Sequence, residues 1–122
     1  MYFSIIPFSH SIGIEPLLYI GEGIIENDIQ IGSLVEIPYG NNIENGIIAK
    51  IYAESPIDRQ SEAYARIKTI IRVITRKVIL APYQIDMICM ISARYIIPIH
   101  RVLAIFLPRP VRTRLERKNY EQ

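Results

Sequence analysis

GSLVEIPYGNNIENGIIAKIYAE, residues 32–54, decides the fold. Val35 and Ile37 alternate with Leu34, Glu36 and Pro38, which predicts a half-buried strand over residues 32–40. Residues 40–46, GNNIENG, hold three asparagines and two glycines. These residue types tolerate positive φ, so the segment is predicted to be a hairpin loop. Residues 47–54 then form the returning strand, and the stretch as a whole predicts a β-hairpin.

Three more strands are expected around this hairpin. Residues 2–8, YFSIIPF, form the first, and Pro7 suggests that it lies at an edge. Residues 17–20, LLYI, form a second, short one. Residues 66–77, RIKTIIRVITRK, alternate throughout and are predicted as one continuous strand. Its side chains on one face are Lys68, Ile70, Arg72, Ile74 and Arg76, with successive cations roughly 13 Å apart.

The last third of the chain has helical periodicity. Pro82 is well placed for a first helical turn, and Pro98 ends this helix. A second, shorter helix follows Pro98. The apolar stripes of the two helices are expected to hold Ile85, Ile88, Cys89, Ser92 and Tyr95, and then Val102, Leu103 and Phe106. The polar, aperiodic residues 55–64 are predicted to be a mobile loop.

Strands followed by helices predict an α+β domain. We expect a small curled β-sheet or partial barrel of about five to six strands, followed by a C-terminal two-helix cap. This domain is expected to span residues 1–108, and residues 109–122 to form a basic tail or linker.

Composition narrows the class of protein. Half of the 122 residues are apolar, and the 27 isoleucines weakly favour strands, because a β-branched side chain fits a pleated surface. No apolar run approaches the roughly 20 residues of a membrane-spanning helix, and the first ten residues do not resemble a signal peptide. Cys89 is the only cysteine, so a disulfide within the chain is excluded. A cytoplasmic protein without a membrane partner is expected.

The chain lacks the motifs of most enzymes. His10, His100 and Cys89 do not have the spacing of zinc ligands. A phosphate-binding loop of the form G-x-x-x-x-G-K-[ST] is missing, and no serine or cysteine lies in a recognisable nucleophile motif. We therefore expect a non-catalytic protein without a metal or a cofactor.

Charge is segregated along the chain, although the net charge is only +2. Residues 66–77 carry five cations and no acid, and residues 109–118 carry five cations with Glu116 as the one acid. Most acids of the first half lie before residue 45. The cationic strand face could bind phosphates, because neutralising them releases condensed counterions. A solvated strand face partly covered by the helices explains the same pattern, so charge leaves both interpretations open.

Three separated blocks carry a family resemblance. GSLVEIPYGNN…NGIIAKI is similar to a hairpin of the form G-x-x-V-x-V-P-F-G…G-I-V, and IKTIIRVI to a lysine-bearing strand that follows it. ISARYIIPIHRVLAIFLPRPVR is similar to a helix pair of the form IADYY-x-x-P-x-G-x-V-L-x-x-x-L-P. Together, and in this order, the blocks resemble the N-terminal 3′-DNA-binding domain of the bacterial replication-restart helicase PriA, or primosomal protein N′. The similarity runs from about residue 2 to residue 112.

The resemblance implies a DNA-binding module of replication restart. Such a module binds fork or single-stranded DNA and the 3′ end of the nascent leading strand. The implied pocket holds a ring for a terminal base or sugar, a close backbone approach and a point charge for the last phosphodiester. Carried over to this chain, the pocket comprises Leu17, Leu18, Tyr19, Gly40 and Lys68. The cationic strand adds Arg72 and Arg76 as DNA-binding candidates.

The chain departs from the family pattern at four positions. Leu17 and Leu18 stand where family members have an aromatic residue followed by a polar one, often aspartate. Leucine cannot hydrogen-bond a base edge or a hydroxyl, so these two positions do not support specific 3′-end capture. Asn41 replaces a basic residue, and His100 replaces a glycine.

Two other functions fit the same sequence. The first is a protein-interaction module that docks a helicase core in cis, or another replication protein, through its helical cap and isoleucine-rich surface. The second is a small RNA-binding barrel, which would be distinguished from a DNA-binding one by its response to the 2′-hydroxyl.

Overall fold

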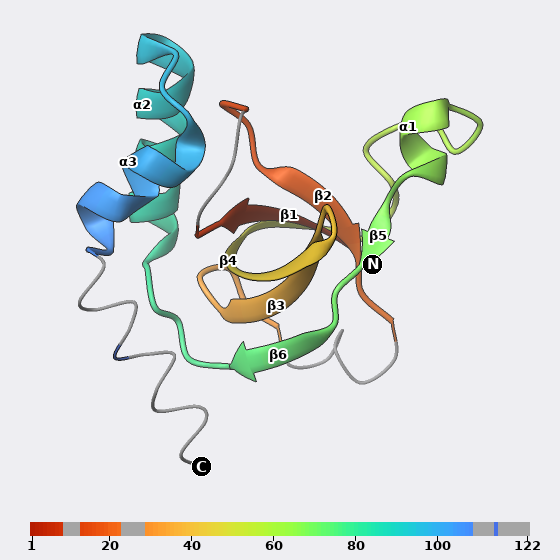
Figure 1. The fold of residues 1–122 in the computed structure, drawn as a ribbon, viewed down its shortest axis with the longest axis horizontal. Helices are drawn as coiled ribbons and strands as arrows, with labels where there is room; N and C mark the ends of the chain where they lie inside the picture. The colour runs from red at the N-terminus through yellow and green to blue at the C-terminus, as the bar shows by residue number, and fades with distance from the viewer. Residues whose placement is uncertain (9–12, 23–28, 109–113, 115–122) are drawn as a thin grey trace.

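A computed structural model of the protein describes residues 1–8, 13–22, 29–108 and 114. Six strands form one curled sheet, two helices pack beside it, and a third, very short helix lies near one sheet edge (Figure 1). The strands are β1 (Tyr2–Pro7), β2 (Leu17–Ile20), β3 (Leu34–Tyr39), β4 (Asn42–Tyr52), β5 (Lys68–Thr69) and β6 (Arg72–Thr75). The helices are α1 (Glu62–Ala65), α2 (Pro82–Tyr95) and α3 (Ile99–Phe106). The predicted α+β partial barrel with a two-helix cap is confirmed.

The strand order is β5-β2-β1-β4-β3-β6, so β1 lies inside the sheet, between β2 and β4. The prediction of an edge strand from Pro7 is therefore wrong for the strand as a whole. At Pro7 itself, however, only one side of β1 is paired. The pairing of β1 with β2 ends at Ile5, and the partner of Pro7 is Gly46 of β4. A proline in this position costs the β1–β2 ladder no hydrogen bond.

The two outermost strands, β5 and β6, are consecutive in sequence. The Ile70 amide donates to the carbonyl of Ile20 at 2.9 Å, and the Ile71 amide donates to the carbonyl of Glu36 at 2.9 Å. Two neighbouring residues thus bond to β2 on one side of the sheet and to β3 on the other. The segment from Lys68 to Thr75 therefore draws the two edges of the curled sheet together, and we call it the seam.

The seam corrects the prediction of one continuous strand over residues 66–77. The backbone changes its partner strand at Ile70 and Ile71, so the strand alternation is interrupted there. Ile70 is buried, with 2% of its surface exposed, whereas Lys68 and Arg72 are exposed. The regular alternation predicted that Ile70 and the cations lie on one face. Because Ile70 is buried and the cations are exposed, this prediction is wrong.

Side chains alternate between two cores. One core lies inside the curled sheet and contains Phe3, Ile5, Tyr19, Ile29, Val35, Ile37, Ile48 and Ile70. The other lies between the sheet and the helices and contains Ile6, Phe8, Leu34, Ile47, Ala49, Leu80, Ile85, Ile88, Ile99, Val102, Leu103 and Leu107. Neighbouring residues in the strands enter different cores, as the period of two requires. The isoleucine-rich strands are thus buried on both faces, which explains why their polar-apolar alternation is weak.

The hairpin between β3 and β4 is tighter than predicted. Tyr39 pairs with Asn42, so only Gly40 and Asn41 form the turn, and the predicted loop over residues 40–46 is too long. Gly46 lies within β4, where an added Cβ would meet Ile5 Cγ2 at 2.5 Å. Gly46 is therefore required by close packing in the strand rather than by a turn.

The helical cap follows the predicted proline pattern. Pro82 is in the first turn of α2, Ile96 ends that helix with a φ of 53°, and Pro98 precedes α3. Ser92 Oγ lies 3.0 Å from the carbonyl oxygen of Ile14 and 2.5 Å from that of Ile97, which ties the turn between the helices to the segment before β2. Tyr95 is 64% exposed and does not belong to the predicted apolar stripe.

The polar segment over residues 55–64 was expected to be a loop, and its end instead forms part of α1. Ser61 caps this helix by accepting a hydrogen bond from the Tyr64 amide at 3.1 Å. The Tyr64 hydroxyl lies 2.7 Å from the Tyr2 hydroxyl, and the two rings are 6.1 Å apart. The contacts of Tyr64 with Tyr2 fasten α1 to β1.

Within the described ranges, none of the helices has the length and apolar character needed to cross a membrane. The described residues also contain no group of three or more His, Cys, Asp and Glu side chains that could hold a metal ion. His10 and, apart from Arg114, the predicted tail over residues 109–122 lie outside the described residues.

Candidate nucleic-acid interface

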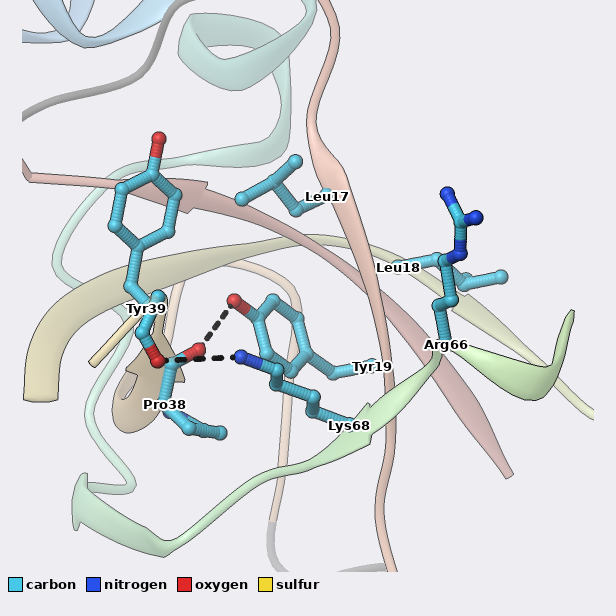
Figure 2. Close-up of a pocket in the computed structure, with 8 residues that line it drawn as sticks. Leu17, Leu18, Tyr19, Pro38, Tyr39, Arg66 and Lys68 are labelled. Carbon is cyan, nitrogen blue, oxygen red and sulfur yellow. Dashed lines mark hydrogen bonds between the residues drawn. The ribbon is translucent and has the colours of Figure 1, made fainter. Parts of the chain in front are cut away.

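A pocket of about 230 Å³ opens where the seam meets β2 and the end of β3. The parallel pairing of β2 with β5 sets Tyr19 opposite Lys68, and the β3–β4 turn brings Gly40 to the same place. The pocket is lined by Leu17, Leu18, Tyr19, Pro38, Tyr39, Gly40, Arg66 and Lys68 (Figure 2). All five residues of the predicted pocket therefore line one cavity.

Tyr19 ties the two sides of the pocket together. Its hydroxyl donates a hydrogen bond to the carbonyl of Pro38 at 2.8 Å. The pKa of this hydroxyl is raised to about 12, chiefly by burial and in smaller part by the neighbouring Tyr39 and Glu44. Only 4% of the residue is exposed, so most of the ring belongs to the core inside the sheet. A ring so covered cannot offer a whole face to a base, and its main role here is to anchor β2 to β3.

Lys68 provides a cation at the pocket. Its ammonium donates to the carbonyl of Gly40 at 3.3 Å and points toward the end of β3, beside the Tyr19 ring (Figure 2). The side chain is otherwise exposed. An ammonium group has three donors, so the bond to Gly40 leaves capacity for a further acceptor such as a phosphate oxygen.

Gly40 is needed for its backbone conformation. Its φ is +59°, while Asn41, the second turn residue, does not have a positive φ, a combination typical of a type II′ turn. A Cβ added at Gly40 would meet no atom within 4 Å. The space beside Gly40 is therefore open, and the glycine is favoured by φ rather than by crowding within the protein.

Leu17 and Leu18 are half-buried and form an apolar wall. Leu17 also packs against the core inside the sheet. Neither side chain can donate or accept a hydrogen bond. On this side the pocket can therefore offer packing to a ligand, but no polar recognition from a side chain.

Three residues of the pocket were not predicted: Pro38, Tyr39 and Arg66. Arg66 follows α1 directly, and its backbone amide bonds to the carbonyls of Ala63 and Tyr64 at the end of that helix. Its guanidinium lies 3.9 Å from Glu62 Oε2, and both side chains are more than 80% exposed. Arg66 has helical backbone angles at the end of α1, so the strand alternation expected over residues 66–77 gave no signal for it.

Arg72 and Arg76 do not line the pocket. Arg72 forms an ion pair with Glu36, with 3.4 Å between Nη2 and Oε2. Arg76 is exposed and directly follows the seam, and its carbonyl accepts a hydrogen bond from the Ser33 hydroxyl at 3.3 Å. The structure thus separates the predicted cations into Lys68, at the pocket, and two arginines outside it.

A curled sheet whose edges meet at a cationic, partly apolar pocket defines a small binding domain. The comparison with family models identifies which one: the model described as "3'DNA-binding domain (3'BD)" of PriA matches residues 18–108. The chain belongs to this family, and it is a DNA-binding domain of the PriA type rather than a catalytic domain. The matched range includes Tyr19, Gly40 and Lys68 and starts one residue after Leu17. A search of curated proteins found no match to the chain.

Proposed function

We propose that this domain binds DNA at replication forks or in single-stranded form and that its pocket receives the 3′ end of a strand. The observation that carries the proposal is the convergence of β2, the β3–β4 turn and the seam on one pocket with an ammonium group. The pocket holds about 230 Å³, and the last nucleotide of a strand can enter it with the chain continuing on one side only.

Each side of the pocket has a distinct role in this proposal. Lys68 neutralises a phosphate near the strand end, and the charge-assisted bond contributes to affinity without selecting a sequence. Leu17 and Leu18 pack against the sugar or base of the last nucleotide, which excludes water from the contact. Tyr19 keeps β2 and β3 at a fixed separation through its bond to Pro38.

In the proposed setting, the domain works in the bacterial cytoplasm as part of the replication-restart machinery. A helicase core, in cis or as a separate protein, would use the DNA end that this domain holds. Neither the domain's chemistry nor its fold requires a cofactor for this role.

The test compares linear and circular single-stranded DNA of the same sequence. A fluorescently labelled linear strand is bound to the domain, and unlabelled linear or circular strands compete for it while anisotropy is measured. Linear DNA should compete about tenfold better, because a contact to an ionised group contributes about 1.5 kcal/mol or more. Equal competition would contradict end capture, and binding that is insensitive to salt would contradict DNA binding by the domain.

RNA of the same sequence serves as a further competitor, and a preference for it would favour the RNA-binding alternative.

A second candidate function is protein interaction, and the outer face of α2 favours it. Tyr83, Met87 and Met90 are exposed at a spacing of four and three residues, which places them on one stripe. Aromatic residues and methionine are enriched in protein interfaces. A helicase core added to the domain should then protect Met87 and Met90 from oxidation by peroxide, which mass spectrometry detects. Unchanged oxidation would count against this candidate.

A further inference from the structure

Ser92 is a polar residue on the buried side of the helical cap. It is buried in α2 together with Ile85 and Ile88, and none of its surface is exposed. Its Oγ lies 3.0 Å from the carbonyl oxygen of Ile14 and 2.5 Å from that of Ile97. A buried hydroxyl needs a hydrogen-bond partner, whereas an alanine would fill nearly the same space without one. The serine at this position is therefore suited to holding these carbonyls in place.

The segment before β2 is bonded to the helical cap at two successive residues. The hydroxyl of Ser92 donates to the carbonyl of Ile14, and the amide of Ile99 donates to the carbonyl of Gly13 at 3.1 Å. The pairing of β2 with β1 includes Leu17 but none of the residues that precede it. The cap, rather than a neighbouring strand, therefore supplies these hydrogen bonds to the segment.

The same segment borders an unfilled space. A cavity of about 420 Å³ lies between α2, β1, β4 and this segment, and Ile14, Glu15 and Pro16 line one of its sides. Chain that is close-packed on every side is held by its neighbours, whereas chain beside a cavity can shift into the space. The hydrogen bonds to the cap are therefore needed to keep this segment in one position.

From these contacts we infer that Ser92 is a positioning residue for the DNA pocket, although it lies in the helical cap and does not line that pocket. The inference rests on the proposed capture of a DNA end. The segment that Ser92 holds leads directly into Leu17 and Leu18, which form the apolar wall of the pocket (Figure 2). A wall that is already fixed loses little conformational freedom when DNA binds. The cap thus contributes to DNA affinity without touching the DNA.

The experiment measures anisotropy for linear and circular single-stranded DNA with the unaltered domain and with Ser92→Ala. The variant should bind linear DNA about threefold more weakly, because Leu17 and Leu18 must then be ordered on binding. Circular DNA has no end to enter the pocket, so both proteins should bind it equally. The preference for linear DNA should therefore fall from about tenfold to about threefold. Circular dichroism at the temperature of the titration shows whether the variant is folded.

Ser33→Ala is the matched control. Ser33 is also fully buried, and its Oγ accepts from the Gln30 amide at 3.1 Å and donates to the Arg76 carbonyl at 3.3 Å. This variant deletes the same atom from an equally buried place, but it leaves the bond between Ser92 and Ile14 intact. It should destabilise the fold at least as much as Ser92→Ala, because it leaves a donor without its partner. Its affinity for linear DNA should nevertheless be unchanged.

A second variant, Pro16→Gly, loosens the segment directly and leaves the helical cap unaltered. Proline fixes φ, whereas glycine allows the widest range of backbone conformations. Pro16→Gly should therefore also weaken binding to linear DNA about threefold. Because both substitutions free the same segment, the double variant should bind less than about fivefold more weakly than the unaltered domain, short of the roughly ninefold that independent effects would give.

A folded Ser92→Ala variant that keeps the full preference for linear DNA overturns the inference and leaves end capture standing. An equal loss of affinity in Ser33→Ala also overturns it, because the loss then follows from general destabilisation. If Ser92→Ala does not fold, Pro16→Gly decides, and unchanged affinity in that variant overturns the inference. Equal binding of linear and circular DNA by the unaltered domain instead contradicts the proposed end capture itself.

Discussion

Lys68 and Arg72 lie four residues apart in the seam, Lys68 in β5, which pairs with β2, and Arg72 in β6, which pairs with β3. Their surroundings differ. The ammonium of Lys68 bonds to a neutral carbonyl, that of Gly40, and borders a pocket. The guanidinium of Arg72 lies 3.4 Å from the carboxylate of Glu36, outside the pocket. A cation bonded to a neutral carbonyl keeps its charge available, whereas one paired with a carboxylate is largely neutralised as seen from a distance. Cations that are regularly spaced in the sequence therefore do not contribute equally to anion binding.

The largest expected effect concerns the two residues at which the backbone changes partner. Ile70→Ala should lower the free energy of unfolding by about 2–4 kcal/mol, because it empties space in the core inside the sheet. Ile71→Ala should lower it by less than about 1 kcal/mol, since Ile71 is 43% exposed. Urea unfolding followed by circular dichroism measures both. Similar losses of unfolding free energy for the two variants would contradict the burial of Ile70 and the exposure of Ile71 at the change of partner strand.

The comparison of the cations predicts a smaller effect, on DNA affinity. Lys68→Ala should weaken binding to single-stranded DNA about tenfold at low salt and reduce the slope of log affinity against log salt by about one. Arg72→Ala should weaken binding by less than about twofold, because Glu36 already offsets its charge. Anisotropy titrations over a series of salt concentrations measure both quantities. Equal effects of the two variants would show that the pocket has no special part in binding.

The smallest expected effect, at neutral pH, belongs to the anchor between β2 and β3. Tyr19→Phe removes the hydroxyl bonded to Pro38 and should cost about 1 kcal/mol of unfolding free energy. Because the pKa of Tyr19 is about 12 in the fold against 10.0 ordinarily, the folded state favours the protonated hydroxyl. The stabilisation is complete below pH 10 and is lost as pH rises toward 12.

The stability difference between the unaltered domain and Tyr19→Phe should therefore shrink between pH 10 and pH 12, as urea unfolding at several pH values would show. The Tyr2 hydroxyl, whose pKa is also raised, chiefly by its hydrogen bond to Tyr64, titrates in both proteins and cancels in the difference. A constant difference over this range would contradict the burial of the Tyr19 hydroxyl.

The parts of the fold that could be predicted from the sequence are those decided by local rules. Pro82 and Pro98 restrict φ and remove an amide donor, so they set the start of α2 and the break before α3 wherever these lie in space. Val35 and Ile37 share one core because strand alternation places i and i+2 on the same face. The pocket residues came from the family resemblance, since nothing local to Tyr19 or Gly40 indicates that they meet.

The parts that could not be predicted depend on which strands meet. The exchange of partners at Ile70 and Ile71 follows from the curl of the whole sheet, and the pattern of residues 66–77 fits a straight strand equally well. Gly46 was assigned to a loop because the need for a small residue there comes from Ile5, far away in sequence. Arg66 was missed as a pocket residue because its place depends on α1, which directly precedes it and is held partly by the contact of Tyr64 with Tyr2.

The closure of the sheet at the seam also links ligand binding to a local opening motion. The amides of Ile70 and Ile71 bond to strands on opposite sides, so they join the walls of the pocket together with the bond of Tyr19 to Pro38, and an opening of the pocket breaks them. A ligand that contacts both β2 and the β3–β4 turn binds only the closed form, and by mass action it makes the open form rarer. The exchange of these two amide hydrogens with solvent therefore reports occupancy of a pocket that neither amide touches.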